Sequence, residues 1–171
     1  MAMHIVLVEP EIPQNTGNIV RTCAGCNAVL HLVRPLGFSV EDRYLKRAGL
    51  DYWHFLDIRY HDSFAEVEAA AREENGGRLP AFYFGTTKGK HRYCDVKYRD
   101  GDYLVFGKET KGLPEPLLHD HYENCIRIPM RPTFRSLNLS NAVAVVLFEA
   151  MRQMEFPDME TQGALTQFHD V

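Results

Sequence analysis

The stretch IPMRPTFRSLNLSNAVAVVLFEA, residues 128–150, passes from a polar loop into the longest apolar run of the chain. Apolar residues then recur at the i, i+3, i+4 and i+7 spacing of an amphipathic helix, which predicts a helix from about Asn138 to Glu155. The preceding loop collects small polar side chains and arginines, namely Arg131, Thr133, Arg135, Ser136, Asn138, Ser140 and Asn141. A helix cap would explain one of these residues, whereas the whole cluster favours a ligand-binding loop.

Short apolar strands and helical segments alternate through the rest of the chain. Strands are predicted at His4–Val8, Leu30–Val33, Ile58–Tyr60, Ala81–Phe84, Tyr103–Phe106 and Cys125–Ile128. Helices are predicted from an Asn15 or Thr16 cap to about Asn27, from Val40 to Ala48 and from Ser63 to about Glu74. This alternation predicts an α/β fold with a mostly parallel sheet flanked by helices. We expect one domain over residues 1–156 and a flexible acidic tail over residues 157–171.

The composition of the 171 residues, 45% hydrophobic and 25% charged, is that of an ordinary soluble globule. The longest unbroken apolar run, residues 142–148, is too short to cross a bilayer, and no signal peptide is recognisable. We therefore expect a cytoplasmic protein without a membrane partner. Cys23 and Cys26 form a C-x-x-C pair, but no second ligand pair accompanies them, so buried thiols are expected rather than a metal or redox site.

The net charge of −4 is unevenly distributed. The four acids after Arg152 account for the whole imbalance, since the remainder holds 19 acidic and 19 basic residues. Residues 88–99 contain five basic residues and one acid, and three further arginines, Arg127, Arg131 and Arg135, follow without an acid between them. Such local clusters are able to bind phosphates, although a solvated surface explains the charge pattern equally well.

Two more predicted strands end in glycine-rich loops, FYFGTTKGK at residues 82–90 and LVFGKETKGLP at residues 104–114. Neither matches the P-loop, and the G-x-G-x-x-G fingerprint of dinucleotide-binding folds is absent. In a parallel sheet, the loops at Gly85, at Gly107 and beyond Ile128 would all lie on the carboxyl edge. We therefore expect them to converge on a pocket suited to an adenine-sized ligand.

The segment PEIPQNTGNIVRTC, residues 10–23, has a different character. Asn15, Asn18 and Arg21 recur at i, i+3 and i+6, which would place them on roughly one side of a helix. Arg21 could bind a phosphate through its planar fork, but a solvent-facing arginine on an amphipathic helix is the simpler interpretation of this segment alone.

Together these segments resemble the SPOUT RNA 2′-O-methyltransferases across nearly the whole chain. NTGNIVRTC, FGKETKGLP and IRIPMRPTFRSLNLSNAVAVVLFEA look like the three motifs of that family, in the family's order. The segments IVLVEPEIPQNTGNIVRTCA, RPLGF, LKRAGLDYW and DGDYLVFGKETKGLP narrow the resemblance to small, single-domain tRNA (cytidine/uridine-34-2′-O)-methyltransferases. The acidic tail is somewhat longer than the minimal form of the family.

The resemblance implies a deep C-terminal trefoil knot, S-adenosyl-L-methionine as methyl donor, no metal, and a homodimer that binds a tRNA anticodon stem-loop. The residues that match the donor-binding positions are Gly85, Gly107, Ile128, Met130, Ser136 and Leu137. Those that match catalytic and RNA-facing positions are Asn15, Arg21, Glu109, Ser136 and Asn138. The family assigns proton removal to Arg21, but a guanidinium is a poor base, so a phosphate clamp is the alternative role.

Two sets of residues are candidates for contact with RNA. The basic stretch 88–99 and the arginines at 131 and 135 are candidates for contact with the anticodon stem. Four aromatic residues could stack on bases, namely Tyr44, Trp53, Tyr93 and Phe134. For each of these rings, burial in the core is the default role. Three other functions remain open. They are methylation of another ribose in tRNA or rRNA, RNA binding without catalysis, and an unrelated nucleotide-binding α/β protein.

Overall fold

The protein was analysed as a computed structural model, which describes residues 2–41, 43, 45, 47 and 52–167. Its centre is a seven-stranded sheet in the order β3-β2-β1-β6-β4-β7-β5, and all neighbouring strands pair in parallel. The strands are β1 (His4–Val8), β2 (Val29–Val33), β3 (Ile58–His61), β4 (Phe82–Gly85), β5 (His91–Arg92), β6 (Tyr103–Phe106) and β7 (Cys125–Arg127). The helices are α1 (Pro13–Gly25), α3 (Phe64–Glu74), α4 (Glu115–Asp120), the 3-10 helix η1 (Tyr122–Asn124) and α5 (Leu139–Gln153).

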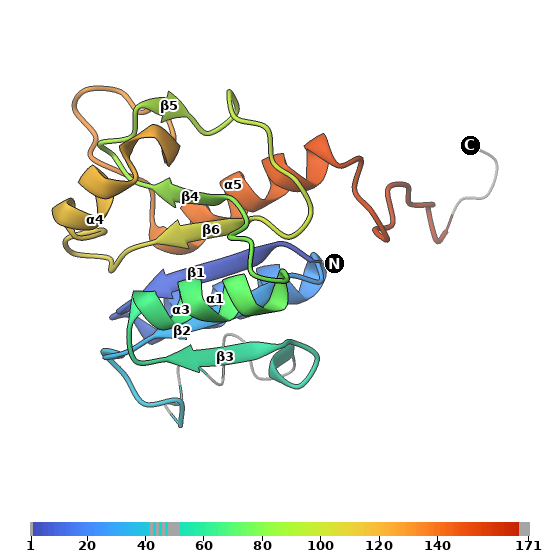
Figure 1. The fold of residues 1–171 in the computed structure, drawn as a ribbon. Helices are drawn as coiled ribbons and strands as arrows, with labels where there is room; N and C mark the ends of the chain where they lie inside the picture. The colour runs from blue at the N-terminus through green and yellow to red at the C-terminus, as the bar shows by residue number, and fades with distance from the viewer. Residues whose placement is uncertain (1, 42, 44, 46, 48–51, 168–171) are drawn as a thin grey trace.

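Helices cover both faces of the sheet, with α3 in front and α5 behind it in the view of Figure 1. One buried cluster joins apolar residues of α1 and α5 to Ile5 and Leu7 of β1. A second cluster joins residues of α3 to Val6 and Val8 of the same strand. Because alternate side chains of β1 enter different clusters, this strand is apolar on both faces, as expected for the centre of a parallel sheet.

The predicted α/β fold with a mostly parallel sheet is confirmed, and all six predicted strands are present within about two residues of their predicted ends. Ser63 caps α3 through a hydrogen bond from the backbone N–H of Glu66, and α5 lies within its predicted range. The sequence did not predict β5 or α4. The helix predicted from Val40 to Ala48 lies largely outside the described residues.

The prediction that Asn15 or Thr16 caps α1 is wrong. The helix begins at Pro13 with Ile12 as its cap residue, and it ends at Gly25 rather than near Asn27. Proline fits the first turn because it has no backbone N–H to leave unpaired. Asn15 is therefore inside the helix, where its side chain is available for contacts with other elements.

The C-terminal segment leaves the end of α5 and remains in contact with the domain for several residues. Phe156 and Met159 pack against the same buried cluster as α5.

Within the described residues, no helix combines the length and the apolar character that a membrane span requires.

Candidate functional site

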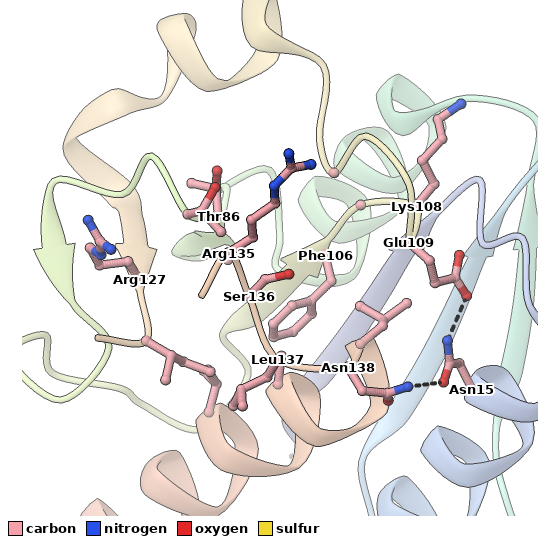
Figure 2. Close-up of a pocket in the computed structure, with 18 of the residues that line it drawn as sticks. Asn15, Thr86, Phe106, Lys108, Glu109, Arg127, Arg135, Ser136, Leu137 and Asn138 are labelled. Atoms are coloured by element: carbon pink, nitrogen blue, oxygen red, sulfur yellow. Dashed lines mark hydrogen bonds between the residues drawn. The ribbon is translucent and has the colours of Figure 1, made fainter. Parts of the chain in front are cut away.

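The loops after β4, β6 and β7 meet at the carboxyl edge of the sheet. These strands are neighbours, and Gly85 at the end of β4 is in register with Phe106 of β6 and with Ile126 of β7. Gly85, Gly107 and Ile128 all line one cavity of about 520 Å³, which is shown in Figure 2. The convergence predicted from three separate loops is therefore present, and the cavity has the size of a typical small-molecule site.

The cavity wall combines apolar and polar surfaces. Apolar side chains come from β7, the following loop and α5, and they include Ile126, Ile128, Met130, Leu137, Leu139, Ala142 and Val146. Polar or charged side chains come from the three loops, from the end of β7 and from α1, and they include Asn15, Thr86, Thr87, Lys108, Glu109, Thr110, Arg127, Arg135, Ser136 and Asn138. A flat apolar group with a polar periphery would match this wall.

Close packing of the loops depends on glycine at two of these positions. A Cβ atom on Gly107 would lie 2.1 Å from the carbonyl carbon of Gly112, so the turn after β6 could not close around a larger residue. A Cβ atom on Gly85 would lie 2.6 Å from the ring of Phe106. Because glycine has no side chain, these two positions allow neighbouring groups to approach the loop backbone closely, and this close approach shapes the cavity.

A line of hydrogen bonds crosses one side of the cavity from the β6 loop to the start of α5 (Figure 2). Asn15 Nδ2 donates to Glu109 Oε1 at 3.2 Å, and Asn138 Nδ2 donates to Asn15 Oδ1 at 2.9 Å. The line ends at Asn138 Oδ1, which accepts from the backbone N–H of Ser140 at 2.9 Å and from its hydroxyl at 2.6 Å. Asn138 is thus both the cap of α5 and part of the cavity wall.

The ends of this line fix the orientation of both amide side chains. A carboxylate only accepts hydrogen bonds and a backbone N–H only donates, so the amides of Asn15 and Asn138 cannot be flipped without losing bonds. Glu109 also accepts from the backbone N–H of Glu11 at 2.7 Å and of Ile12 at 3.0 Å. It thereby supplies the cap that α1 lacks in its own sequence.

Arg21 lies away from the cavity of its own chain. Its side chain is exposed, with the guanidinium carbon 5.2 Å from the ring centroid of Tyr52. Asn18 is also exposed, whereas Asn15 is buried. The spacing predicted these three residues on roughly one side of a helix, and within a single chain only Asn15 of the three lines the cavity.

Much of the basic stretch 88–99 is paired with acids. Its ion pairs are Lys88–Glu115 at 2.5 Å, Lys90–Glu123 at 2.5 Å and Arg92–Asp95 at 2.7 Å. By contrast, Arg127 and Arg135 are exposed at the cavity, and the structure records no ion pair for them within the described residues. Arg127 and Arg135 therefore supply positive charge for an anionic partner directly at the cavity.

The candidate aromatic residues have different environments. Tyr93 lines the cavity, Trp53 packs against the core, and Phe134 has 63% of its surface exposed. Tyr44 lies outside the described residues. Cys23 and Cys26 are buried as expected, and burial raises the pKa of the Cys26 thiol to about 11.

Some cavity residues were not predicted from the sequence. Thr86 and Thr87 follow Gly85 directly, and their place after a strand-end glycine is a signal that could have identified them. Lys108 and Thr110 adjoin Glu109 in the same way. Ile12 had no such signal, because it was not recognised as the start of α1.

Comparisons with known proteins agree with this architecture. Residues 2–148 match the SpoU rRNA Methylase family. The tRNA (cytidine(34)-2′-O)-methyltransferase of Escherichia coli strain K12 is 52% identical over 157 residues, which cover 91% of this chain and 96% of that protein. A solved structure that concerns 2-OH methylation of C/U34 on tRNA superposes with a TM-score of 0.83 at 44% identity, covering 90% of this chain and 97% of the other.

The fold also extends to more distant proteins. A SpoU methyltransferase from Streptomyces viridochromogenes, solved in complex with AdoMet, gives a TM-score of 0.81 at 24% identity and covers 90% of this chain and 58% of its own. This likeness concerns the fold. The family match spans most of the chain and agrees with the arrangement of the three loops, so the chain belongs to the SpoU methylase family.

Proposed function

We infer that this protein transfers a methyl group from S-adenosyl-L-methionine to the ribose 2′-oxygen of the wobble nucleotide, C34 or U34, in tRNA. The observation that carries this proposal is the cavity in which the loops after β4, β6 and β7 meet the Asn15–Asn138 line. The name of the relative from Escherichia coli supports the same reaction and the same nucleotide.

The cavity fits the proposed methyl donor. Its apolar side could receive an adenine ring, and its hydroxyl, amide and backbone groups could receive the ribose and amino-acid portions. We assign this binding to Gly85, Gly107, Ile128, Met130, Ser136 and Leu137. The bound donor supplies an electrophilic methyl group attached to a positively charged sulfur.

We assign the side-chain amides of Asn15 and Asn138 to the stabilisation of the acceptor oxygen. Each amide nitrogen has a second N–H that the line of hydrogen bonds does not use. The 2′-oxygen gains negative charge as its proton passes to the phosphate held by Arg21 or to a water molecule, and fixed N–H donors stabilise such charge. Glu109 already accepts three hydrogen bonds, so we assign it an orienting role rather than that of a base. Ser136 lines the same cavity, and we assign it to both donor binding and catalysis.

We propose a homodimer in which Arg21 of one subunit completes the cavity of the other. This arrangement would account for an arginine that matches a catalytic position and yet lies outside the cavity of its own chain. Arg21 would hold a phosphate of the RNA with its planar fork, and Arg21→Lys should therefore lose most activity. Mixing subunits with Arg21→Lys and subunits with Asn15→Asp should restore part of it, whereas a monomer or two inactive pools would contradict the shared site.

A trefoil knot is the proposed path of the C-terminal segment. The segment between β4 and β6 passes through β5, and β7 later inserts between β4 and β5. Gln153 at the end of α5 then bonds to the same segment, through Val96 O and Tyr98 N, both at 3.0 Å. β7 enters the sheet between β4 and β5, which the chain has already connected to each other. This order of strands supports threading of the C-terminal segment through that connection. We place the whole reaction in one domain, residues 1–156, with residues 157–171 as a tail.

The RNA surface is assigned first to Arg127, Arg131 and Arg135, and second to residues 88–99, where acids already pair three of the basic side chains. Affinity for an anticodon stem-loop should fall steeply with salt, because bound phosphates release counterions. A flat salt response would contradict this surface. A tRNA substrate also implies a cytoplasmic location.

The test is incubation of the protein with labelled methyl donor and total tRNA from a strain that lacks the gene, followed by nucleotide mapping. Label on the 2′-oxygen of nucleotide 34 is the expected result. Label on another ribose would assign the protein to a different member of the family. Binding of RNA without label, together with no donor binding in calorimetry, would favour a non-catalytic module.

A further inference from the structure

Each of two loops beside the cavity has a carboxylate that accepts hydrogen bonds from the other loop. Glu109, in the loop after β6, accepts from the backbone N–H groups of Glu11 and Ile12. Glu11, in the loop after β1, accepts in return from the hydroxyl of Thr110 at 2.7 Å and from its backbone N–H at 3.3 Å. These bonds join segments about one hundred residues apart in the sequence, and we call them the reciprocal clamp.

We propose that Glu11 and Thr110 are positioning residues for methyl transfer, because the reciprocal clamp holds the β6 loop so that Glu109 keeps Asn15 and Asn138 in their reactive orientation. This proposal rests on the proposed function. It assigns a role to Glu11, which does not line the cavity and must therefore act through its neighbours.

The surroundings of Glu11 restrict it on two sides. Gly37 N donates to Pro10 O at 2.9 Å, and a Cβ atom on Gly37 would lie 2.7 Å from Glu11 Cα, so the loop after β2 supports Glu11 from behind. The Thr110 bonds hold it in front and lower the pKa of its carboxyl, with Lys108 and Lys111 adding to that effect. The ionised side chain therefore ties the β6 loop to the body of the domain.

The clamp allows the position of Glu109 to be disturbed without changing the Glu109 side chain or the hydrogen bonds that it accepts. Removing the Glu11 side chain leaves the backbone N–H of Glu11 free to donate to Glu109, and it leaves the Asn15 bond intact. Only the return bonds to Thr110 are lost. A catalytic defect in such a variant would therefore come from looser positioning of the β6 loop.

The test compares Glu11→Ala, Glu11→Gln, Thr110→Val and Thr110→Ser with wild type, measuring kcat and the KM for S-adenosyl-L-methionine on tRNA. We expect Glu11→Ala to lower kcat by about tenfold or more with KM within about twofold, since small misplacements of reacting groups are costly. Both Thr110 donors contact one oxygen, which glutamine also carries, so Glu11→Gln should keep nearly full activity. Thr110→Val should have a smaller effect than Glu11→Ala, and Thr110→Ser should resemble wild type.

Glu74→Ala is the matched control, because it removes a carboxylate bonded to Arg59 outside the cavity wall. It should leave kcat unchanged. If Glu11→Ala does not fold, Thr110→Val carries the test. Wild-type kcat in Glu11→Ala and Thr110→Val, or equal losses in Glu74→Ala, would overturn the proposal.

Hydrogen exchange separates this proposal from the proposed function. The backbone N–H of Thr110 is bonded to Glu11 Oε1, so it should exchange faster in Glu11→Ala than in wild type whether or not tRNA is the substrate. An inactive wild type would reject the proposed function. In that case unchanged exchange at Thr110 would also reject the clamp, and faster exchange would support it.

Discussion

Two lines of hydrogen-bonded side chains cross this molecule, one at the cavity and one beneath α3. The first joins Glu109, Asn15, Asn138 and Ser140. The second joins three histidines on adjacent strands: His4 Nδ1 lies 2.9 Å from His31 Nε2, and His31 Nδ1 lies 2.9 Å from His61 Nε2. Each line spans three elements of the fold, yet only the first borders a cavity.

The lines differ in how their protons are arranged. The carboxylate of Glu109 and the backbone N–H of Ser140 leave one arrangement for the amide line. The neutral histidine line has no such ends in its recorded bonds, so its protons satisfy the same contacts in either direction. A defined direction of donors is useful for catalysis, whereas a line with two directions serves well to fill a core with satisfied polar groups.

Asn15→Asp should break the amide line most severely. The new carboxylate would face Glu109 at the place where Asn15 Nδ2 now donates, so two acceptor groups would meet where a donor and an acceptor are now paired. We expect the rate of methyl transfer in single turnovers to fall by about 100-fold or more, as for the loss of a fixed donor in other active sites.

Asn124→Asp makes the same chemical change at an exposed position outside the cavity wall. It should keep wild-type turnover. If Asn15→Asp and Asn124→Asp methylate tRNA equally fast, the amide line has no part in the reaction, and the comparison between the two lines fails.

His31→Leu should break the histidine line with the opposite outcome. His31 is fully buried, and its loss leaves His4 and His61 each without a partner for one ring nitrogen. We expect a loss of about 1–3 kcal/mol in the free energy of unfolding, the usual cost of unsatisfied buried groups. Urea denaturation measures this loss. Turnover per folded molecule should stay at the wild-type level, and a large catalytic defect would show that the two lines are coupled.

The histidine line also predicts how stability depends on pH. Burial lowers the pKa of His31 to about 2 and, with Arg59 adding to the effect, that of His4 to about 4, against 6.5 in the unfolded chain. As the pH falls below 6.5, the unfolded chain takes up protons that the folded protein refuses. The free energy of unfolding must therefore decrease on acidification, by about 1 kcal/mol for one such histidine between pH 7 and 5.5.

Comparison of urea midpoints at these two pH values provides the measurement. His31→Leu should lose less stability on acidification than wild type, because it has one buried histidine fewer. His119→Gln, which changes a histidine whose side chain is 88% exposed, should lose as much as wild type. Identical losses in all three proteins would mean that the buried histidines do not control the pH response.

The sequence predicted elements that carry their own pattern. The strand YLVF of β6 is buried at every position, and α5 repeats its apolar residues at helical spacing. Elements that depend on neighbours were missed. β5 has two residues and exists through its pairing with β7, and the six-residue helix α4 buries Leu118 in a cluster with residues of β4 and β6. Short segments of this kind have no periodicity to detect.

The same limit applies to the site. Glycines directly after apolar strands indicated a cavity, because parallel strands end on one edge. Helical spacing correctly placed Asn15 and Arg21 on one helix, but it could not show that Asn15 faces Glu109 while Arg21 faces Tyr52. The histidine line was invisible for the same reason, since single histidines in three strands become a line only through strand register.

Ser140→Ala should have the smallest effect and tests how much of the amide line is needed. Asn138 Oδ1 loses the hydroxyl donor at 2.6 Å but keeps the backbone N–H donor at 2.9 Å, so its orientation is preserved. We expect kcat to fall by no more than about threefold and stability by about 1 kcal/mol, the usual contribution of one hydrogen bond. Ser63→Ala is the matched control, because the Ser63 hydroxyl also makes one hydrogen bond at a helix start, where it accepts from the backbone N–H of Glu66 on the far side of the sheet. It should lose similar stability with no loss of kcat. A drop in kcat as large as that of Asn15→Asp would place Ser140 in the reaction itself, since the direction of the line would then require both donors.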